Sequence, residues 1–180
     1  MWGALTLDAS KVVVHAFVSS CVDYCNSVFS LVRVKHLLPL QSVLNAAAHV
    51  ISRWRKYDHI SDVVRDQIHW LPIAKRIEHK LCILVPKFLH QLAPQYLVEM
   101  CKVVSELRGC RNLRSASCGA LIELRMKTST YELRSFAVCD PRTWNRPPSN
   151  LRDHSLSEGQ FSSVLKTELF HRAYLPVKQR

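Results

Sequence analysis

Apolar side chains recur every three or four residues through the first hundred residues of this 180-residue chain. This spacing puts them on one face of an α-helix, which must then bury that face against a neighbouring element. The chain has only four glycines, which argues against a β architecture with many tight turns. The sequence therefore predicts a mainly α fold, a helical bundle.

Capping residues and prolines set the expected helix boundaries in this part. Ser10 is a suitable N-cap for the first helix, and Pro39 is expected where the regular part of the second begins. Asp58 or Ser61 should cap the third. The predicted helices, in chain order, are residues 10–28, 34–53, 57–68, a helix that starts at Pro72, and 95–104.

The helix that starts at Pro72 is predicted to be amphipathic and basic. Five apolar side chains fall within about 80° of arc at 100° per residue. They are Ile73, Ile77, Leu81, Leu84 and Phe88. Basic side chains lie mainly on the remaining arc, namely Lys75, Arg76, His79, Lys80 and Lys87. Pro86 lacks a backbone donor and should kink or end this helix.

The period changes after residue 104. Residues 121–124 favour a short strand, so we expect a small β-hairpin over 112–130, followed by a short helix over 131–138. Pro147-Pro148 is a hard break. These features divide the chain into a helical region (1–104), an irregular or hairpin region with a short helix (105–154), and a C-terminal helix with a tail (155–180).

The last predicted helix starts at Ser157. Ser157 and Gln160 have the spacing of a capping box, in which each side chain bonds the other residue's backbone N–H. Phe161, Leu165 and Leu169 follow at helical spacing and should form its buried face.

The net charge of +11 favours a polyanionic partner or a negatively charged membrane face, and the alternative is that the charge serves solubility alone. The basic residues are dispersed over the sequence rather than gathered in one tail, and 48% of the residues are hydrophobic, enough for a packed core. Contact with nucleic acid is the function class that this balance favours.

The seven cysteines are an odd number, and residues 1–10 lack the basic and apolar regions of a signal peptide. We therefore expect an intracellular protein, in the nucleus or the cytoplasm, that is not secreted. Residues 12–34 are apolar but contain His15, Asp23, Asn26 and Arg33, which argues against a membrane span.

The sequence shows no catalytic or metal-binding constellation. Cys21 and Cys25 stand one helical turn apart, but zinc needs a second pair, which is missing. Asp58, Asp62 and Asp66 share helical spacing, yet basic neighbours favour a solvated, salt-bridged face over a metal site. No phosphate-binding glycine motif is present, so we expect no cofactor, no metal and no enzyme activity from this chain.

Three tryptophans are interleaved with basic residues: Trp54, Trp70 and Trp144. Such pairs can stack on bases and contact phosphates. Trp70 and Trp144 are better explained as core anchors, and the neighbouring arginines and lysines are the better candidates for contact.

A series of short motifs is more informative than any one of these residues. In chain order the motifs are His15-Ala16-Phe17-Val18-Ser19-Ser20, Asp23-Tyr24-Cys25-Asn26-Ser27, Leu40-Gln41, Leu44-Asn45-Ala46-Ala47-Ala48, Lys56-Tyr57-Asp58-His59-Ile60, His69-Trp70-Leu71-Pro72-Ile73, Arg76-Ile77-Glu78, Lys87–Leu92, Leu113-Arg114-Ser115, Arg134-Ser135-Phe136, Pro141-Arg142-Thr143-Trp144-Asn145, Phe161, and Leu165-Lys166-Thr167-Glu168-Leu169-Phe170. This series resembles the region downstream of the palm in jockey-like, LINE-type (non-LTR) retrotransposon reverse transcriptases, and it covers residues 11–174.

The resemblance implies the thumb and C-terminal part of an RNA-directed DNA polymerase. Such parts help to hold the template–product duplex while an upstream palm polymerises. The family's catalytic aspartates precede the region that this chain resembles, so none is assigned here. The implied partners are RNA or an RNA–DNA duplex, and the upstream palm itself, with no membrane and an undetermined oligomeric state.

The chain departs from the family pattern at three positions. Pro86 stands at an aromatic position, Gln91 at a glycine, and Pro147 at the leucine of a Trp-Asn-x-Leu-Pro motif. A helix-interior proline costs about 3 kcal/mol. Such changes suit a decaying element copy, so the alternative hypothesis is a relic, or a helical protein-interaction module without a selected nucleic-acid function.

Non-catalytic contact with the nucleic-acid backbone is the function that the sequence favours. The main candidates for neutralising phosphates are Lys75, Arg76, Lys80 and Lys87, and the secondary ones are Arg53, Arg55 and Lys56.

Overall fold

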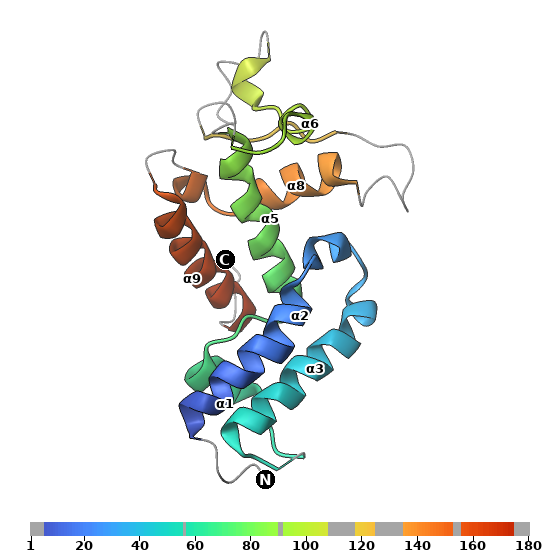
Figure 1. Ribbon diagram of the computed structural model, residues 1–180. Helices are drawn as coiled ribbons and strands as arrows, with labels where there is room; N and C mark the ends of the chain where they lie inside the picture. The colour runs from blue at the N-terminus through green and yellow to red at the C-terminus, as the bar shows by residue number, and fades with distance from the viewer. Residues whose placement is uncertain are drawn as a thin grey trace, which may run out of the picture.

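The computed structural model describes residues 6–55, 57–89, 92–107, 118–124, 135–152 and 156–174. These residues are mainly α-helical, which confirms the predicted fold class. In the described ranges the β structure consists of an isolated antiparallel bridge between Val103 and Leu121. Figure 1 shows two lobes, one built on α1, α2 and α3 and one on α6, α8 and α9, with α5 running between them.

The first helical rod runs from Leu7 to Asp23 in three pieces: α1 (Leu7–Val14), the π-helix η2 (His15–Ser19) and α2 (Ser20–Asp23). Ser10 was expected to be its N-cap, and this was wrong. Thr6 is the cap, since its Oγ1 accepts a 3.2 Å hydrogen bond from the N–H of Ala9. Ser10 lies one turn later, buried, and its hydroxyl donates to the Thr6 carbonyl.

The rod also ends earlier than residue 28. Cys25 adopts a left-handed conformation with φ of 49°, and a separate 3₁₀-helix, η3 (Asn26–Phe29), follows it. Cys21 and Cys25 are therefore not on successive turns of one helix. Within the described ranges, no group of three or more His, Cys, Asp or Glu residues is arranged to hold a metal ion.

The next long helix, α3 (Val34–Ser52), confirms the prediction for residues 34–53, with Arg53 as a left-handed C-cap. Its regular part begins at Val34 rather than at Pro39, which lies in the second turn with its side chain exposed. Helix α3 lies beside α1 (Figure 1), and Ala47 and Ile51 bury against Val14.

The predicted helix over residues 57–68 starts at Ser61. It consists of α4 (Ser61–Val63) and a second π-helix, η4 (Val64–Ile68). Neither expected cap forms, because the Asp58 carboxylate accepts the backbone N–H of Arg55 at 2.9 Å, outside the helix. Arg65 pairs with Asp62 and Asp66, as the predicted salt-bridged face requires.

Helix α5 (Ile73–Leu89) is the centre of the fold. Pro72 precedes it, and its carbonyl accepts the first helical hydrogen bond, from the N–H of Arg76. The N-terminal half buries Ile73, Ile77 and Leu81 against α3, and the C-terminal half packs into a second cluster with α8 and α9. Pro86 does not end the helix, which continues to Leu89 because Val85 and Phe88 are buried on both sides of the proline.

After α5 the chain forms α6 (Gln95–Val98), the 3₁₀-helix η5 (Val104–Glu106), α8 (Phe136–Trp144), the 3₁₀-helix η7 (Ser149–Arg152) and α9 (Glu158–Tyr174). Helix α6 is shorter than the predicted 95–104: it ends at Val98, and Val103, which pairs with Leu121, is extended rather than helical. Most of the predicted hairpin, residues 112–117 and 125–130, lies outside the described residues, as do positions 131–134 of the predicted helix 131–138. Helix α8 instead extends through Pro141 to Trp144.

The capping box at the start of α9 is confirmed. The Ser157 N–H donates to Oε1 of Gln160 at 3.1 Å, and the Gln160 N–H donates to Oγ of Ser157 at 3.4 Å. Phe161, Leu165 and Leu169 are buried, as predicted. They join a cluster that draws on all three predicted regions of the chain: Leu71, Cys82, Val85, Phe88, Cys101, Leu121, Trp144, Leu151, Phe161, Leu165 and Leu169. None of the helices described is long and apolar enough to cross a bilayer.

Candidate nucleic-acid interface

The four candidate cations of α5 lie on two different faces of the helix. At 100° per residue, Arg76, Lys80 and Lys87 fall within about 40° of arc, whereas Lys75 lies about 100° from Arg76. The first three face the side of α5 that is next to α9, and Lys87 forms a 2.9 Å ion pair with Glu158 at the start of α9. Only this face can present more than one of the candidates to a single ligand.

Arg76 and Lys80 line a groove of about 470 Å³. Its walls are η2 and α2 on one side, the segment 68–71 at one end, and α5 and α9 on the other side. The groove is lined by His15, Ser19, Asp23, Asn26, Ile68, His69, Trp70, Leu71, Arg76, His79, Lys80, Ile83 and Lys166.

Arg76 holds two walls of this groove together. Its Nη1 donates a 2.7 Å hydrogen bond to Oδ2 of Asp23 on α2, and its Nε donates to the Leu71 carbonyl at 2.9 Å. The guanidinium carbon lies 5.3 Å from the centroid of the Trp70 ring, within cation–π range. The side chain is only 13% exposed. Arg76 is thus largely committed to the fold, and its charge is offset by Asp23.

Lys80 and Lys166 are the exposed cations of the groove. The groove therefore carries three permanent cations, counting Arg76, against the single carboxylate of Asp23. Among groove residues the excess charge is positive, and low-dielectric walls strengthen the attraction for an anion.

His79 adds a titratable group between the two lysines. Its Nε2 lies 3.2 Å from the Ser162 carbonyl of α9. Burial lowers the pKa of His79, the hydrogen bond to Ser162 raises it, and the charges of Lys166 and Lys80 lower it further while Asp23 raises it. An anion in the groove would oppose the lowering, so its binding should be coupled to proton uptake at His79.

Two buried polar side chains in the groove have a hydrogen-bonding atom without a partner. Ser19 and Asn26 are 2% and 1% exposed, and both line the groove. No described residue bonds Oγ of Ser19 or Oδ1 of Asn26. The Nδ2 of Asn26 faces Oδ1 of Asp23 at 3.4 Å, which fixes the amide orientation and leaves Oδ1 as the open acceptor.

Irregular backbone surrounds the same groove. Both π-helices contribute lining residues, and π-turns are frequent at functional sites. His69 adopts φ of 54°, a left-handed conformation that is uncommon for residues other than glycine. The ring of Phe170 packs against His69, and Oη of Tyr174 donates to the Trp70 carbonyl at 2.8 Å, so α9 holds this segment in place.

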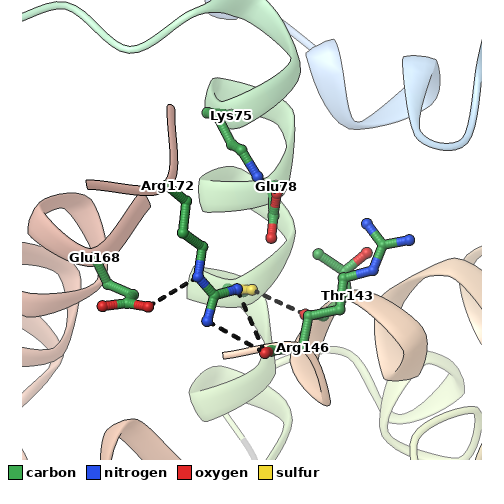
Figure 2. Close-up of polar contacts among 7 residues, drawn as sticks. Lys75, Glu78, Thr143, Arg146, Glu168 and Arg172 are labelled. Carbon is green, nitrogen blue, oxygen red and sulfur yellow. Dashed lines mark hydrogen bonds and ion pairs between the residues drawn. The ribbon is translucent and has the colours of Figure 1, made fainter. Parts of the chain in front are cut away.

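Lys75 lies outside the groove, where its Nζ is 2.7 Å from Oε2 of the buried Glu78. Figure 2 shows this pair on α5 beside the junction with α8 and α9. There Arg172 donates to Glu168 and to the Arg146 carbonyl. Lys75 neutralises a buried carboxylate, so the fold already uses its charge.

The secondary candidates lie elsewhere. Arg53 and Arg55 are exposed and follow the C-terminal end of α3, which is at the opposite end of the molecule from the C-terminus of α5 (Figure 1). Lys56 lies outside the described residues. The structure therefore brings together Arg76 and Lys80, with Lys87 further along the same face, but does not bring Arg53 or Arg55 to them.

Trp70 and Trp144 pack in the apolar core, as predicted from the sequence. Trp144 is buried, and its Nε1 donates to the Gly119 carbonyl at 2.9 Å, while Trp70 is half-buried against three apolar clusters. Ser19, Asn26 and Lys166 are not among the site residues predicted from the sequence. The motifs that resemble the reverse transcriptases contain all three, and this was the only signal that could have drawn attention to them.

Comparison with known proteins returned no matching family model, no matching curated protein and no matching solved structure.

Proposed function

We propose that this chain is a non-catalytic C-terminal part of a non-LTR retrotransposon reverse transcriptase, and that it contacts the backbone of RNA or of an RNA–DNA duplex. The observation that carries the proposal is the groove in which Lys80, Lys166 and His79 converge around Arg76. The motif series supports the family assignment, and the net charge of +11 supports a polyanionic partner.

The mechanism is phosphate neutralisation with release of counterions. Lys80 and Lys166 contact phosphates. Lys87 lies about 10 Å further along α5, and its ion pair with Glu158 is of the weak, exposed kind that a phosphate can replace, so the three lysines form a cation track. Arg76 positions the walls of the groove rather than the ligand, because its donors already serve Leu71 and Asp23. Lys75, Arg53, Arg55 and Lys56 add to the overall positive field.

Polymerisation in this proposal belongs to an upstream palm, which is also the proposed protein partner. The three aspartates at helical spacing do not form a carboxylate pair for two metal ions, since Arg65 pairs with Asp62 and Asp66. The proposed location is intracellular, in the nucleus or cytoplasm, where such a partner would be found.

Filter binding of the full chain to an RNA–DNA duplex at varied salt tests the proposal. We expect affinity to fall steeply with salt, and Lys80→Ala with Lys166→Ala to lower the slope by about one unit for each lysine. Lys102→Ala removes an exposed lysine outside the groove and is the matched control. Absence of binding at low salt, or binding without a salt slope, would contradict the proposal, and primer extension by the chain alone would contradict its non-catalytic part.

A second candidate is a protein-interaction module, favoured by the apolar surface of residues 12–28. Val12, Phe17, Tyr24 and Val28 are 67% to 79% exposed. Exposed apolar side chains at this density are typical of a surface that another chain covers. In that case Phe17→Ser with Tyr24→Ser should abolish any cellular phenotype of the chain, while charge reversal at the exposed groove lysines, Lys80→Glu with Lys166→Glu, leaves that phenotype unchanged.

A further inference from the structure

The floor of the groove differs chemically from its rim. The rim carries Lys80 and Lys166, which suit a phosphate. The floor is formed in part by Ser19 and Asn26, whose Oγ and Oδ1 atoms lie buried just beneath the groove surface without a partner among the described residues, so a ligand reaches them by displacing the side chains around them. A phosphate has no hydrogen-bond donor to offer Oδ1, so phosphate contact alone does not account for the floor, and the donor must come from a ribose 2′-hydroxyl or from a base.

A nucleobase supplies what the floor lacks. Every unpaired base carries at least one N–H on its Watson–Crick edge, which Oδ1 of Asn26 can accept, and the Ser19 hydroxyl can either donate or accept. Leaving a buried acceptor unpaired carries the full desolvation penalty of that group, so a ligand that pairs it gains specificity. Ile68, Leu71 and Ile83 give the groove apolar walls for the flat faces of a ring.

The size and the surroundings of the groove fit one nucleotide of a strand. A volume of about 470 Å³ is in the range of small-molecule sites. The cation track continues past the groove to Lys87, about 10 Å beyond Lys80, which is the axial rise of about three nucleotides in one strand. A free mononucleotide would leave that part of the track unused.

We propose that the groove binds one unstacked nucleotide of a nucleic-acid strand, with its phosphate at Lys80 and Lys166 and its base on Ser19 and Asn26. The inference rests on the proposed nucleic-acid function and adds a single-nucleotide subsite to it. Arg76 keeps Asp23 neutralised, so the one carboxylate in the groove does not repel the phosphate.

The test compares two ligands that differ only in the base. An RNA–DNA duplex with one unpaired 3′ nucleotide is matched with the same duplex that ends in an abasic unit, and each is titrated with the full chain. We expect the abasic ligand to bind at least about tenfold more weakly, the effect of two hydrogen bonds of ordinary strength. Guanosine monophosphate should compete only weakly, because it lacks the phosphates that reach Lys87, and strong competition would overturn the assignment to a strand.

Substitutions show which side chains distinguish the ligand with a base from the abasic ligand. Ser19→Ala with Asn26→Ser should abolish the difference between the two ligands and leave the salt slope unchanged. Lys80→Ala with Lys166→Ala should weaken both ligands equally and leave their ratio unchanged. If the wild-type chain binds both ligands equally with a normal salt slope, the subsite is wrong and the proposed function stands. If it binds neither at low salt, the proposed function itself fails.

Photo-crosslinking makes the result independent of whether the variants fold. A 4-thiouridine at the unpaired 3′ position should crosslink to peptides that contain residues 15–26 or 68–83, identified by mass spectrometry. Crosslinks confined to other parts of the chain would overturn the subsite.

Discussion

The Nη1 atom of Arg76 lies 2.7 Å from Oδ2 of Asp23, and this ion pair ties α5 to the end of the N-terminal rod. The two residues are far apart in the sequence, yet the pair sets the width of the groove between their helices. Since Nε of Arg76 also bonds the Leu71 carbonyl, one guanidinium fixes three segments of the chain.

Arg76→Lys should therefore destabilise the fold even though it keeps the charge. A lysine ammonium cannot reproduce the fork that reaches Asp23 and Leu71 together, so we expect the free energy of unfolding in urea to fall by about 1–3 kcal/mol. Arg65→Lys is the matched control, because Arg65 pairs with Asp62 and Asp66 at the surface, and its unfolding midpoint should not move. Equal effects of the two substitutions would contradict the role assigned to Arg76.

Stability should also depend on pH through Asp140. This carboxyl is fully buried in α8; Oδ2 accepts a weak hydrogen bond from Sγ of Cys101, and Oδ1 has no partner among the described residues. Burial raises the pKa of Asp140 to about 7, and the Cys101 thiol opposes the rise only in part. The folded state therefore prefers the protonated, neutral acid.

Whether stability rises or falls with pH is set by the difference in bound protons between the folded and unfolded states. Between the unfolded pKa near 4 and the folded pKa near 7, the native state binds more protons than the unfolded one, so stability falls as pH rises through this window. The loss amounts to a few kcal/mol and is complete above pH of about 7. Asp140→Asn cannot ionise, so in urea titrations it should match the wild type near pH 4 and exceed it near pH 8. A wild-type stability that rises from pH 5 to pH 7, with no change in this trend in Asp140→Asn, would show that the buried carboxyl is ionised.

Five of the seven cysteines should separate into two classes of reactivity. Cys82, Cys101 and Cys139 are buried. Burial raises the pKa of all three thiols, that of Cys101 to about 12. Cys21 and Cys25 are exposed. Iodoacetamide at neutral pH should therefore label the two exposed cysteines first and the three buried ones only after unfolding in urea, as peptide mass spectrometry would show. Early labelling of Cys82 would contradict the packing of α5 against α8.

The features predicted correctly from the sequence are those that depend on neighbouring residues in the chain. The capping box of Ser157 and Gln160, the stripe of Phe161, Leu165 and Leu169, and the span of α3 all depend on residues within a few turns of one another. Their confirmation shows that periodicity and cap chemistry were sufficient there. Thr6 caps the helix although Ser10 also suits the position, because Oγ1 of Thr6 accepts the Ala9 N–H while the Ser10 hydroxyl bonds the Thr6 carbonyl from inside the helix.

The groove could not be predicted in the same way. Ser19, Asn26 and Lys166 come from the rod, from η3 and from α9, and only tertiary packing brings them together. Their types are common at helix surfaces, so nothing in the local pattern sets them apart. Conversely, Lys75 and Arg76 are adjacent in the sequence but face different surfaces and pair with different carboxylates. The sequence predicted that both are basic residues of one helix, but it did not predict which carboxylate each one neutralises.

Pro86 is a residue that a helix interior does not favour but that this fold tolerates. Helix α5 continues past it, so the position lacks the backbone hydrogen bond to the Cys82 carbonyl, and the ring crowds that carbonyl. Pro86→Ala should restore the bond and raise the free energy of unfolding by about 1–3 kcal/mol, the range set by helix propensity less the packing lost with the ring. Pro72→Ala is the control on the same helix: a proline suits the start of a helix, so this substitution should leave stability unchanged or lower it slightly. Urea titrations of the two variants measure the difference, and a Pro86→Ala chain no more stable than the wild type would mean that α5 already bends to relieve the clash.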